Sequence, residues 1–127
     1  LSLHDALPIY PPIKLQTPSG YTLMVGKNNL QNDELTTHIA DKNDWWFHVK
    51  DYPGSHVIMI TGGEEPPIED FTFAAQTAAV YSSAGAGAKV AVDYTKIRHI
   101  KKPAGSRPGY VTYDPYWTAY VSKGDSL

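Results

Sequence analysis

The chain has 127 residues, of which 42% are hydrophobic and 19% charged, a composition typical of one globular domain with a modest core. It contains no cysteine, which excludes disulfides and thiolate metal sites and is compatible with a reducing cytoplasm, and no apolar run approaches the ~20 residues of a membrane-spanning helix. The formal net charge of −2 argues against a protein that binds nucleic acid through its overall charge.

The first nine residues differ in character from the rest of the chain. Residues 1–9 read LSLHDALPI, which resembles the translation of a sequencing adapter, and we interpret them as an artefact without fold or function. The fold is therefore expected to occupy residues 10–127.

Proline, glycine and asparagine divide the remainder into short periodic segments. The predicted elements, in chain order, are strands 13–16 and 21–25, a short helix 33–40, strands 45–50 and 56–61, a long helix 68–84, strand 88–94 with an extended continuation at 97–101, and strands 109–113 and 117–121. Asn32 is expected to cap the short helix. Strands in adjacent pairs predict a single α+β domain of order ββαββαβββ, with one short and one long helix packed on a largely antiparallel or mixed sheet.

Residues 44–60, DWWFHVKDYPGSHVIMI, predict a strand pair with a tight turn. Successive side chains of a strand point to opposite faces, so the first strand has two distinct faces. These faces are Trp45, Phe47 and Val49 on one side, and Trp46, His48 and Lys50 on the other. The first is typical of a core, whereas the second places an aromatic ring beside two groups that can carry positive charge. Pro53 and Gly54 suit the central positions of a type II turn.

An aromatic ring beside cations on an exposed face is typical of a surface that stacks a base and holds a phosphate. The predicted RNA-binding residues of this strand pair are Trp46, His48, Lys50, Asp51, Ser55 and His56. In one alternative, Trp46 is half-buried and its neighbours are ordinary surface residues. In another, the histidines serve a metal site or a hydrolase with Ser55 as nucleophile. That chemistry is disfavoured, because zinc needs three or four ligands and no nucleophile motif is present. We therefore expect neither catalysis nor a metal or other cofactor.

A polar run ahead of the short helix forms a second group of candidates. Its predicted RNA-binding residues are Lys27, Asn28, Asn29, Gln31 and Asn32. A cation, several amides and the free N–H groups of a helix N-terminus suit a phosphate or a nucleotide edge. In the alternative, the asparagine side chains bond their own backbone and hold the loop.

Charge is distributed unevenly along the chain. Residues 89–110 hold six basic residues and one acid, a net charge of +5, whereas residues 64–70 carry −4. The predicted RNA-binding residues of the basic segment are Lys96, Arg98, Lys101, Lys102 and Arg107. A local basic patch interleaved with aromatic residues binds phosphates even when the total charge is near zero, although it can also be an ordinary solvated face.

Three motifs in order resemble the NFACT-R domain, the RNA-binding domain of ribosome-quality-control factors and their fibronectin-binding-protein-A-like bacterial relatives. The motifs are G-K-N-N-x-Q-N-D from Gly26, D-x-W-F-H-V-K-D-x-P-G-S-H-V from Asp44, and K-K-P-x-G-x-x-P-G-x-V from Lys101. The resemblance covers roughly residues 20–113.

The resemblance implies a cytoplasmic module that binds transfer RNA or ribosomal RNA on a stalled large subunit, without a membrane or a cofactor. In the family the domain often follows larger domains, so a fragment of a longer protein is expected. Phosphates would be held by Lys27, Lys50, Lys101, Lys102 and Arg107, and a base would stack on Trp46. His48, Asp51 and His56 would position the hairpin or donate hydrogen bonds.

Two other partners stay open. The aromatic tail at 113–120, with Tyr116 and Trp117, is less like the family and is either a second stacking surface or a capping strand. A module that binds protein would use Trp46 and this tail, with binding insensitive to salt. DNA is a variant of the RNA prediction, and a requirement for the 2′-hydroxyl would separate the two.

Overall fold

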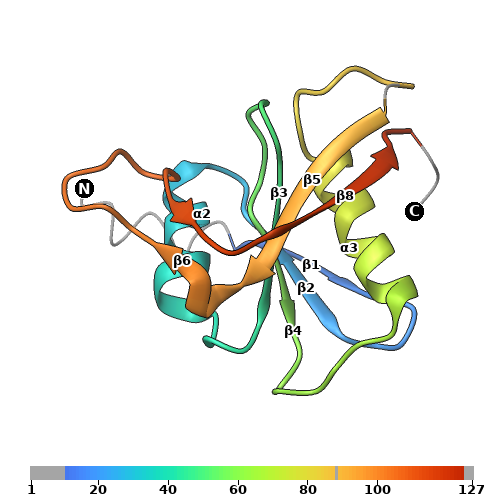
Figure 1. Ribbon diagram of the computed structural model, residues 1–127, viewed down its shortest axis with the longest axis horizontal. Coiled ribbons are helices and arrows are strands. Elements are labelled where there is room, and N and C mark those ends of the chain that lie inside the picture. Colours follow the sequence, from blue (N-terminus) through green and yellow to red (C-terminus); the bar gives the residue numbers. More distant parts are fainter. Residues whose placement is uncertain (1–10, 88, 125–127) are drawn as a thin grey trace.

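The computed structural model describes residues 11–87 and 89–124. The interpretation of residues 1–9 as an artefact falls outside these ranges. The elements of the described residues are β1 (Ile13–Gln16), β2 (Thr22–Val25), α2 (Asn29–Glu34), the π-helical segment η2 (Leu35–Ile39), β3 (Trp45–Val49), β4 (Val57–Ile60), α3 (Ile68–Val80), β5 (Lys89–Lys96), the 3-10 turn η3 (Ile97–His99), β6 (Ile100–Lys101), β7 (Thr112–Tyr113) and β8 (Trp117–Ser122) (Figure 1). Paired strands with a short and a long helix confirm the predicted α+β class. Within the same ranges, no helix combines the length and the apolarity needed to cross a membrane.

Six strands form one antiparallel sheet in the order β1-β2-β4-β3-β5-β8. β3 lies inside this sheet, with Trp46 opposite Ile58 of β4 and His48 opposite Asp93 of β5. β6 and β7 form a separate two-stranded ribbon. Because β3 is paired on both edges, its side chains keep a fixed register with those of β4 and β5.

Each face of the sheet buries its own hydrophobic cluster. On one face, Trp45 and Phe47 pack against α3, whose buried face is formed by small residues. These are Ala74, Ala75, Ala78 and Ala79. On the other face, Trp46 packs with Ile58 and with Leu35 of η2. The alternation of β3 thus separates two layers, with α3 on one side and α2 with the β6–β7 ribbon on the other (Figure 1).

The short helix begins four residues earlier than predicted. Asn28, not Asn32, is its N-cap, and Asn28 Oδ1 accepts a hydrogen bond from the backbone N–H of Gln31 at 2.9 Å. Asn32 lies inside α2, where it is buried. Its Oδ1 accepts from the backbone N–H of His56 at 3.0 Å, so a long-range contact takes the side chain that the local sequence offered as a cap.

The predicted type II turn at Pro53 and Gly54 is wrong. That turn requires a positive φ at the glycine, but in this segment the positive φ, 69°, belongs to Asp51. Gly54 instead forms a β-bridge with Ser82, just after α3. A Cβ at Gly54 would lie 3.0 Å from the Cβ of Ser82, so the close approach of the two backbones accounts for the glycine.

Candidate nucleic-acid interface

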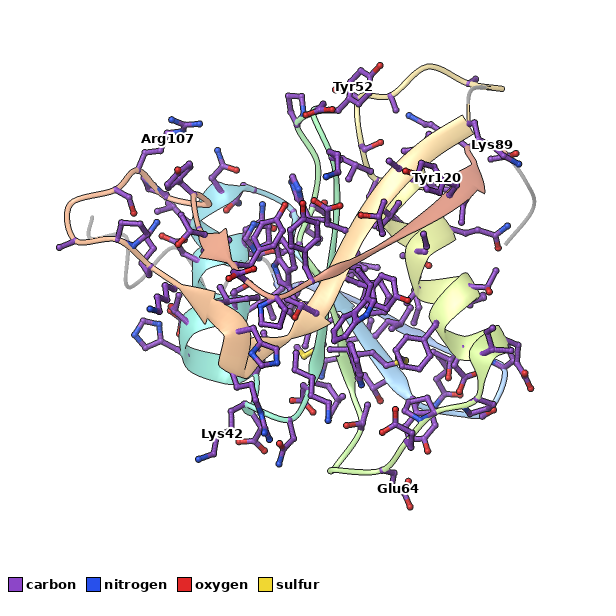
Figure 2. The ribbon with its side chains drawn as sticks, in the orientation of Figure 1. Lys42, Tyr52, Glu64, Lys89, Arg107 and Tyr120 are labelled. Carbon is purple, nitrogen blue, oxygen red and sulfur yellow. The ribbon has the colours of Figure 1, made fainter. Side chains whose placement is uncertain are left out.

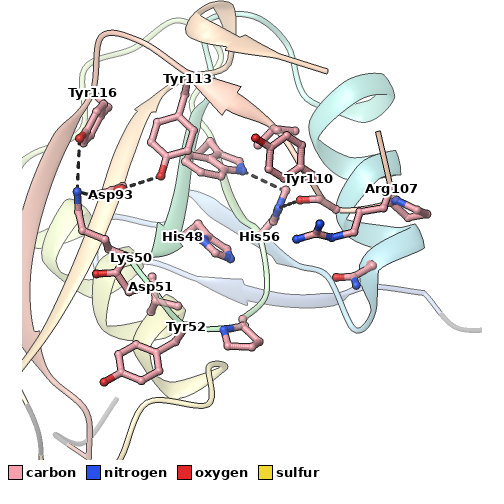
Figure 3. A pocket seen from close by; sticks show the side chains of 18 residues that line it. His48, Lys50, Asp51, Tyr52, His56, Asp93, Arg107, Tyr110, Tyr113 and Tyr116 are labelled. Atoms are coloured by element: carbon pink, nitrogen blue, oxygen red, sulfur yellow. Dashed lines mark hydrogen bonds and ion pairs between the residues drawn. The ribbon is translucent and has the colours of Figure 1, made fainter. Parts of the chain in front are cut away.

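A hollow of about 850 Å³ opens on the face of the sheet opposite α3 (Figure 3). Five parts of the chain meet there: the start of α2, β3 with the turn that follows it, the middle of β5, residues 107–113, and the approach to β8. The lining residues are Asn29, Trp46, His48, Val49, Lys50, Asp51, Tyr52, Pro53, Gly54, His56, Asp93, Arg107, Pro108, Gly109, Tyr110, Val111, Tyr113 and Tyr116. We call this site the tyrosine hollow.

The tyrosine hollow brings together part of each predicted group. The predicted residues that line it are Asn29, Trp46, His48, Lys50, Asp51, His56 and Arg107. The predicted residues that do not line it are Lys27, Asn28, Gln31, Asn32, Ser55, Lys96, Arg98, Lys101 and Lys102. The β3–β4 hairpin and the end of the basic segment therefore share one site, to which the asparagine run contributes one residue.

The prediction that Trp46 presents its ring on an exposed face is wrong. Its side chain is 1% exposed, and the rings of Trp46 and Tyr113 have centroids 4.7 Å apart. The indole N–H donates to His56 Nδ1 at 3.1 Å. Alternation correctly separates Trp46 from the α3 core, but the opposite face carries a second core under η2 and β7. Trp46 is part of the floor of the tyrosine hollow rather than a free stacking surface.

His56 links three parts of the chain from a buried position. Its Nδ1 accepts from Trp46 and lies 2.7 Å from Thr36 Oγ1, and its Nε2 lies 3.1 Å from the carbonyl oxygen of Gly109. Since an indole N–H can only donate, Nδ1 carries no proton and Nε2–H is the donor to Gly109. Burial, together with nearby His48, lowers the pKa of His56 to about 3. His56 is thus a neutral structural residue. It connects the sheet to residues 101–110, which we call the basic loop.

His48 lies beside this network. Its ring stacks on Trp46 with centroids 5.8 Å apart and stands 5.4 Å from the ring of His56. Burial lowers the pKa of His48, which disfavours the positive charge that the sequence suggested for it. Among the described residues, no group of three or more histidine, aspartate or glutamate side chains is placed to hold a metal ion.

The asparagine run adopts the arrangement in which side chains bond the backbone. Asn28 caps α2, and Gln31 Oε1 accepts from the backbone N–H of Lys27 at 2.8 Å. A Cβ at Gly26 would lie 2.0 Å from Asn32 Oδ1, so the glycine leaves room for that amide. Three of the predicted binding amides, those of Asn28, Gln31 and Asn32, are therefore engaged in holding the loop.

Three members of the run are exposed. These are Lys27, the cap residue Asn28 and Asn29, and Asn29 also lines the tyrosine hollow. Ser55 belongs with the structural members, because its hydroxyl donates to the carbonyl oxygen of Gly26 at 2.5 Å.

Lys50 is held by an acid that sequence analysis did not assign to the site. Its Nζ lies 3.5 Å from Asp93 Oδ1 and 3.4 Å from the hydroxyl oxygen of Tyr116 (Figure 3). These two partners raise the pKa of Lys50, the tyrosine contact being the larger cause. The hydroxyl of Tyr113 donates to Asp93 Oδ2 at 2.6 Å, and that of Thr118 donates to Oδ1 at 2.8 Å. Buried Asp93 thus joins β3, β5, β7 and β8 beneath the tyrosine hollow.

The basic segment divides into cations that hold the fold and cations that face solvent. Lys102 Nζ pairs with Asp33 Oδ1 at 3.2 Å and donates to the carbonyl oxygens of Arg107 and Tyr110 at 2.6 and 2.9 Å. Lys102 therefore fixes the loop against α2. Lys101 and Arg107 are exposed, and the Arg107 guanidinium lies 5.4 Å from the centre of the Tyr110 ring.

Two further cations of the segment lie away from the tyrosine hollow. Arg98 Nη2 donates to Asn43 Oδ1. Lys96 Nζ lies 5.5 Å from the ring centre of Trp45, on the α3 face of the sheet. The +5 segment therefore does not act as one patch, and of its cations Arg107, in the loop at 101–110, is the one that lines the hollow.

Sequence reasoning missed several residues that shape the site. Tyr52, Asp93 and Tyr113 line the tyrosine hollow without having been selected as binding residues. The available signal was the alternation of β5, which places Asp93 on the same face as Trp46 and His48 of the paired strand. The aromatic tail does reach the site through Tyr116, which is 42% exposed.

Most of the residues that line the tyrosine hollow lie within a range that matches a known family. The chain matches the model of the family described as "NFACT protein RNA binding domain" over residues 12–113. The chain belongs to this family. The matched range includes both strands of the hairpin, the asparagine run and the whole basic loop.

Individual relatives agree with the family assignment. A relative from Bacillus subtilis strain 168, named "Rqc2 homolog RqcH", is 50% identical over 107 residues, which are 84% of this chain. A protein of the same name from Streptococcus suis is 48% identical over 99 residues, 78% of the chain. The chain spans 18% of the length of each of these relatives.

A solved structure has a similar fold. It is the C-terminal part of the fibronectin/fibrinogen-binding protein from Streptococcus suis, at 41% identity and a TM-score of 0.85. The similarity covers 91% of this chain and 47% of that one.

Proposed function

We propose that this NFACT-R domain binds RNA of the translation system, transfer RNA or ribosomal RNA, at the tyrosine hollow and its basic loop. It does so in the cytoplasm as the RNA-binding part of ribosome quality control on stalled large subunits. The observation that carries the proposal is the exposed Arg107–Tyr110 pair at the edge of a hollow lined by further tyrosines. RNA recognition combines phosphate contacts with stacking of unpaired bases on aromatic or arginine side chains.

The cations available for phosphate are those without a strong internal partner. Lys27, Lys101 and Arg107 are exposed and supply the charge. Lys50 can contribute only in competition with Asp93, and Lys102 is engaged in holding the loop. The stacking role proposed for Trp46 passes to Tyr110 and Tyr116, each 42% exposed.

The histidines and Ser55 suit binding rather than catalysis. Both ring nitrogens of His56 are bonded within the protein, to Trp46 and to Gly109. The Ser55 hydroxyl donates to a backbone carbonyl oxygen. In this proposal His48, His56 and Ser55 position the hairpin and the basic loop around the RNA. No cofactor is required for binding.

Reversing the charge of the basic loop should weaken RNA binding. With Lys101→Glu and Arg107→Glu together, we expect the dissociation constant for total transfer RNA to rise about tenfold or more. The slope of the logarithm of the binding constant against the logarithm of the salt concentration should become shallower by about 1–2. Two phosphate contacts and the counterions that they release are lost. Fluorescence anisotropy at several salt concentrations measures both quantities.

A matched control variant has the same change in net charge at positions outside the basic loop. Lys14 and Lys89 are exposed and do not line the tyrosine hollow, so Lys14→Glu with Lys89→Glu should change affinity and slope much less. A duplex DNA probe tests the preference for RNA. Equal losses in both double variants, or equal binding of the DNA, would contradict RNA recognition by this loop.

A further inference from the structure

A second hollow lies on the α3 face of the sheet. It measures about 310 Å³. Its walls include the rings of Trp45, Phe71, Tyr94 and Trp117, and its edge carries Glu65 and Ile68. We call it the acidic groove.

Strand alternation places the acidic groove and the tyrosine hollow on opposite faces of one sheet. In β3, Trp45 lines the groove and Trp46 the hollow, and in β5, Tyr94 and Asp93 are divided in the same way. Figure 2 shows Glu64, in the segment between β4 and α3, well separated from Arg107. A molecule in one site therefore leaves the other accessible.

The acidic groove exposes large apolar side chains. Ile68 at the start of α3 is 80% exposed and Trp117 of β8 is 50% exposed. The aromatic walls of the groove are packed against one another without a partner. The Trp45 ring packs edge-on against Phe71 with centroids 4.9 Å apart, and its centroid lies 6.1 Å from that of Trp117. A preformed aromatic pocket with exposed apolar residues beside it is typical of a protein-binding hot spot.

Charge identifies the kind of partner. Glu64, Glu65 and Glu69 are exposed within residues 64–70, a segment with no basic residue. Lys96 Nζ lies 5.5 Å from the ring centre of Trp45 and offsets one of these three negative charges, which leaves the edge acidic. An acidic edge excludes RNA phosphates and favours a positively charged partner.

We propose that the acidic groove docks a basic segment of a partner protein, with one large apolar side chain in the groove and flanking lysines or arginines facing Glu65 and Glu69. A pocket of this size, at the small end of binding sites, suits a single anchoring side chain. The site is independent of the proposed RNA interface, so the domain can hold RNA on one face and a basic protein segment on the other.

Selection from a random peptide library displayed on phage, with the whole chain as target, tests the proposal. The expected result is an enriched motif with one large apolar residue flanked by lysine or arginine. A synthetic peptide of that motif should bind at least about tenfold more weakly to Ile68→Ser with Glu65→Gln, because an anchor contact and a charge partner are lost. Both side chains are exposed, so the variant should keep the fold, which circular dichroism checks.

The control variant is Lys101→Glu on the opposite face, which should leave peptide binding unchanged. Failure to enrich a motif, or an acidic or neutral motif, would overturn the proposal. So would a basic motif whose peptide binds the Ile68→Ser, Glu65→Gln variant as tightly as the original chain. Sedimentation of the chain alone tests a second copy as the occupant, and dimerisation that Ile68→Ser abolishes would also overturn it. RNA binding serves as a separate readout, because the Ile68→Ser, Glu65→Gln variant should bind transfer RNA as the original chain does.

Discussion

Replacing Trp46 with alanine should lower the free energy of unfolding by about 3–5 kcal/mol, the usual cost of removing a large buried aromatic side chain. The Trp46 ring is 1% exposed, and it contacts Tyr113 and packs beside Leu35 and Ile58. The substitution also removes one of the two groups that donate to His56 Nδ1, the other being the Thr36 hydroxyl. Unfolding in urea, followed by far-UV circular dichroism, measures the change.

Trp117→Ala provides the control for this prediction. Trp117 is 50% exposed and should cost much less stability than Trp46. If Trp46→Ala left stability unchanged but abolished RNA binding, the indole would be a free stacking surface. The burial of Trp46 in a second core would then be contradicted.

Stability should fall in acid partly because His56 is buried in its neutral form. Its pKa is lowered from an ordinary 6.5 to about 3, so between these values the unfolded chain binds a proton that the folded chain does not. The contribution of His56 is fully present above pH 6.5 and is lost as the pH falls toward 3, by about 1.4 kcal/mol per pH unit. Between pH 7 and pH 4 this amounts to about 3 kcal/mol.

His56→Gln isolates that contribution from those of other titrating groups. Glutamine does not titrate, and its amide N–H can still donate toward the Gly109 carbonyl. We expect the variant to be less stable at pH 7 but to lose less stability on acidification than the original chain. Chemical unfolding at pH 4, 5, 6 and 7 measures the free energy of unfolding of both proteins. If it fell equally with pH in the variant and in the original chain, His56 would not be held neutral by the fold.

Much of the fold follows from local periodicity. Strand alternation predicted β1 at its observed bounds and placed Trp45 and Phe47 together in the α3 core. The start of α2 was not predictable in this way, because Asn28 and Asn32 are equally suitable caps by residue type. The choice between them depends on the bond from the His56 backbone to Asn32, which only the tertiary structure supplies.

The residues of the candidate site were predicted as separate groups rather than as one surface. The hairpin and the basic segment were each selected from the sequence, and the structure links them through the contact between His56 and the Gly109 carbonyl oxygen. Periodicity cannot show that a second layer covers a strand face, so Trp46 looked exposed. Charge counting likewise cannot show that Lys102 pairs with Asp33 within the fold.

The most direct test of the central claim is to map the RNA on the protein. Backbone amide chemical shifts of the isotopically labelled chain, recorded during titration with a transfer RNA transcript, report the surface that RNA contacts. We expect changes concentrated in residues 50–52 and 107–110 and at Tyr116, with α3 unaffected. Changes concentrated on α3 and the acidic groove, or the absence of changes at saturating RNA, would contradict the claim.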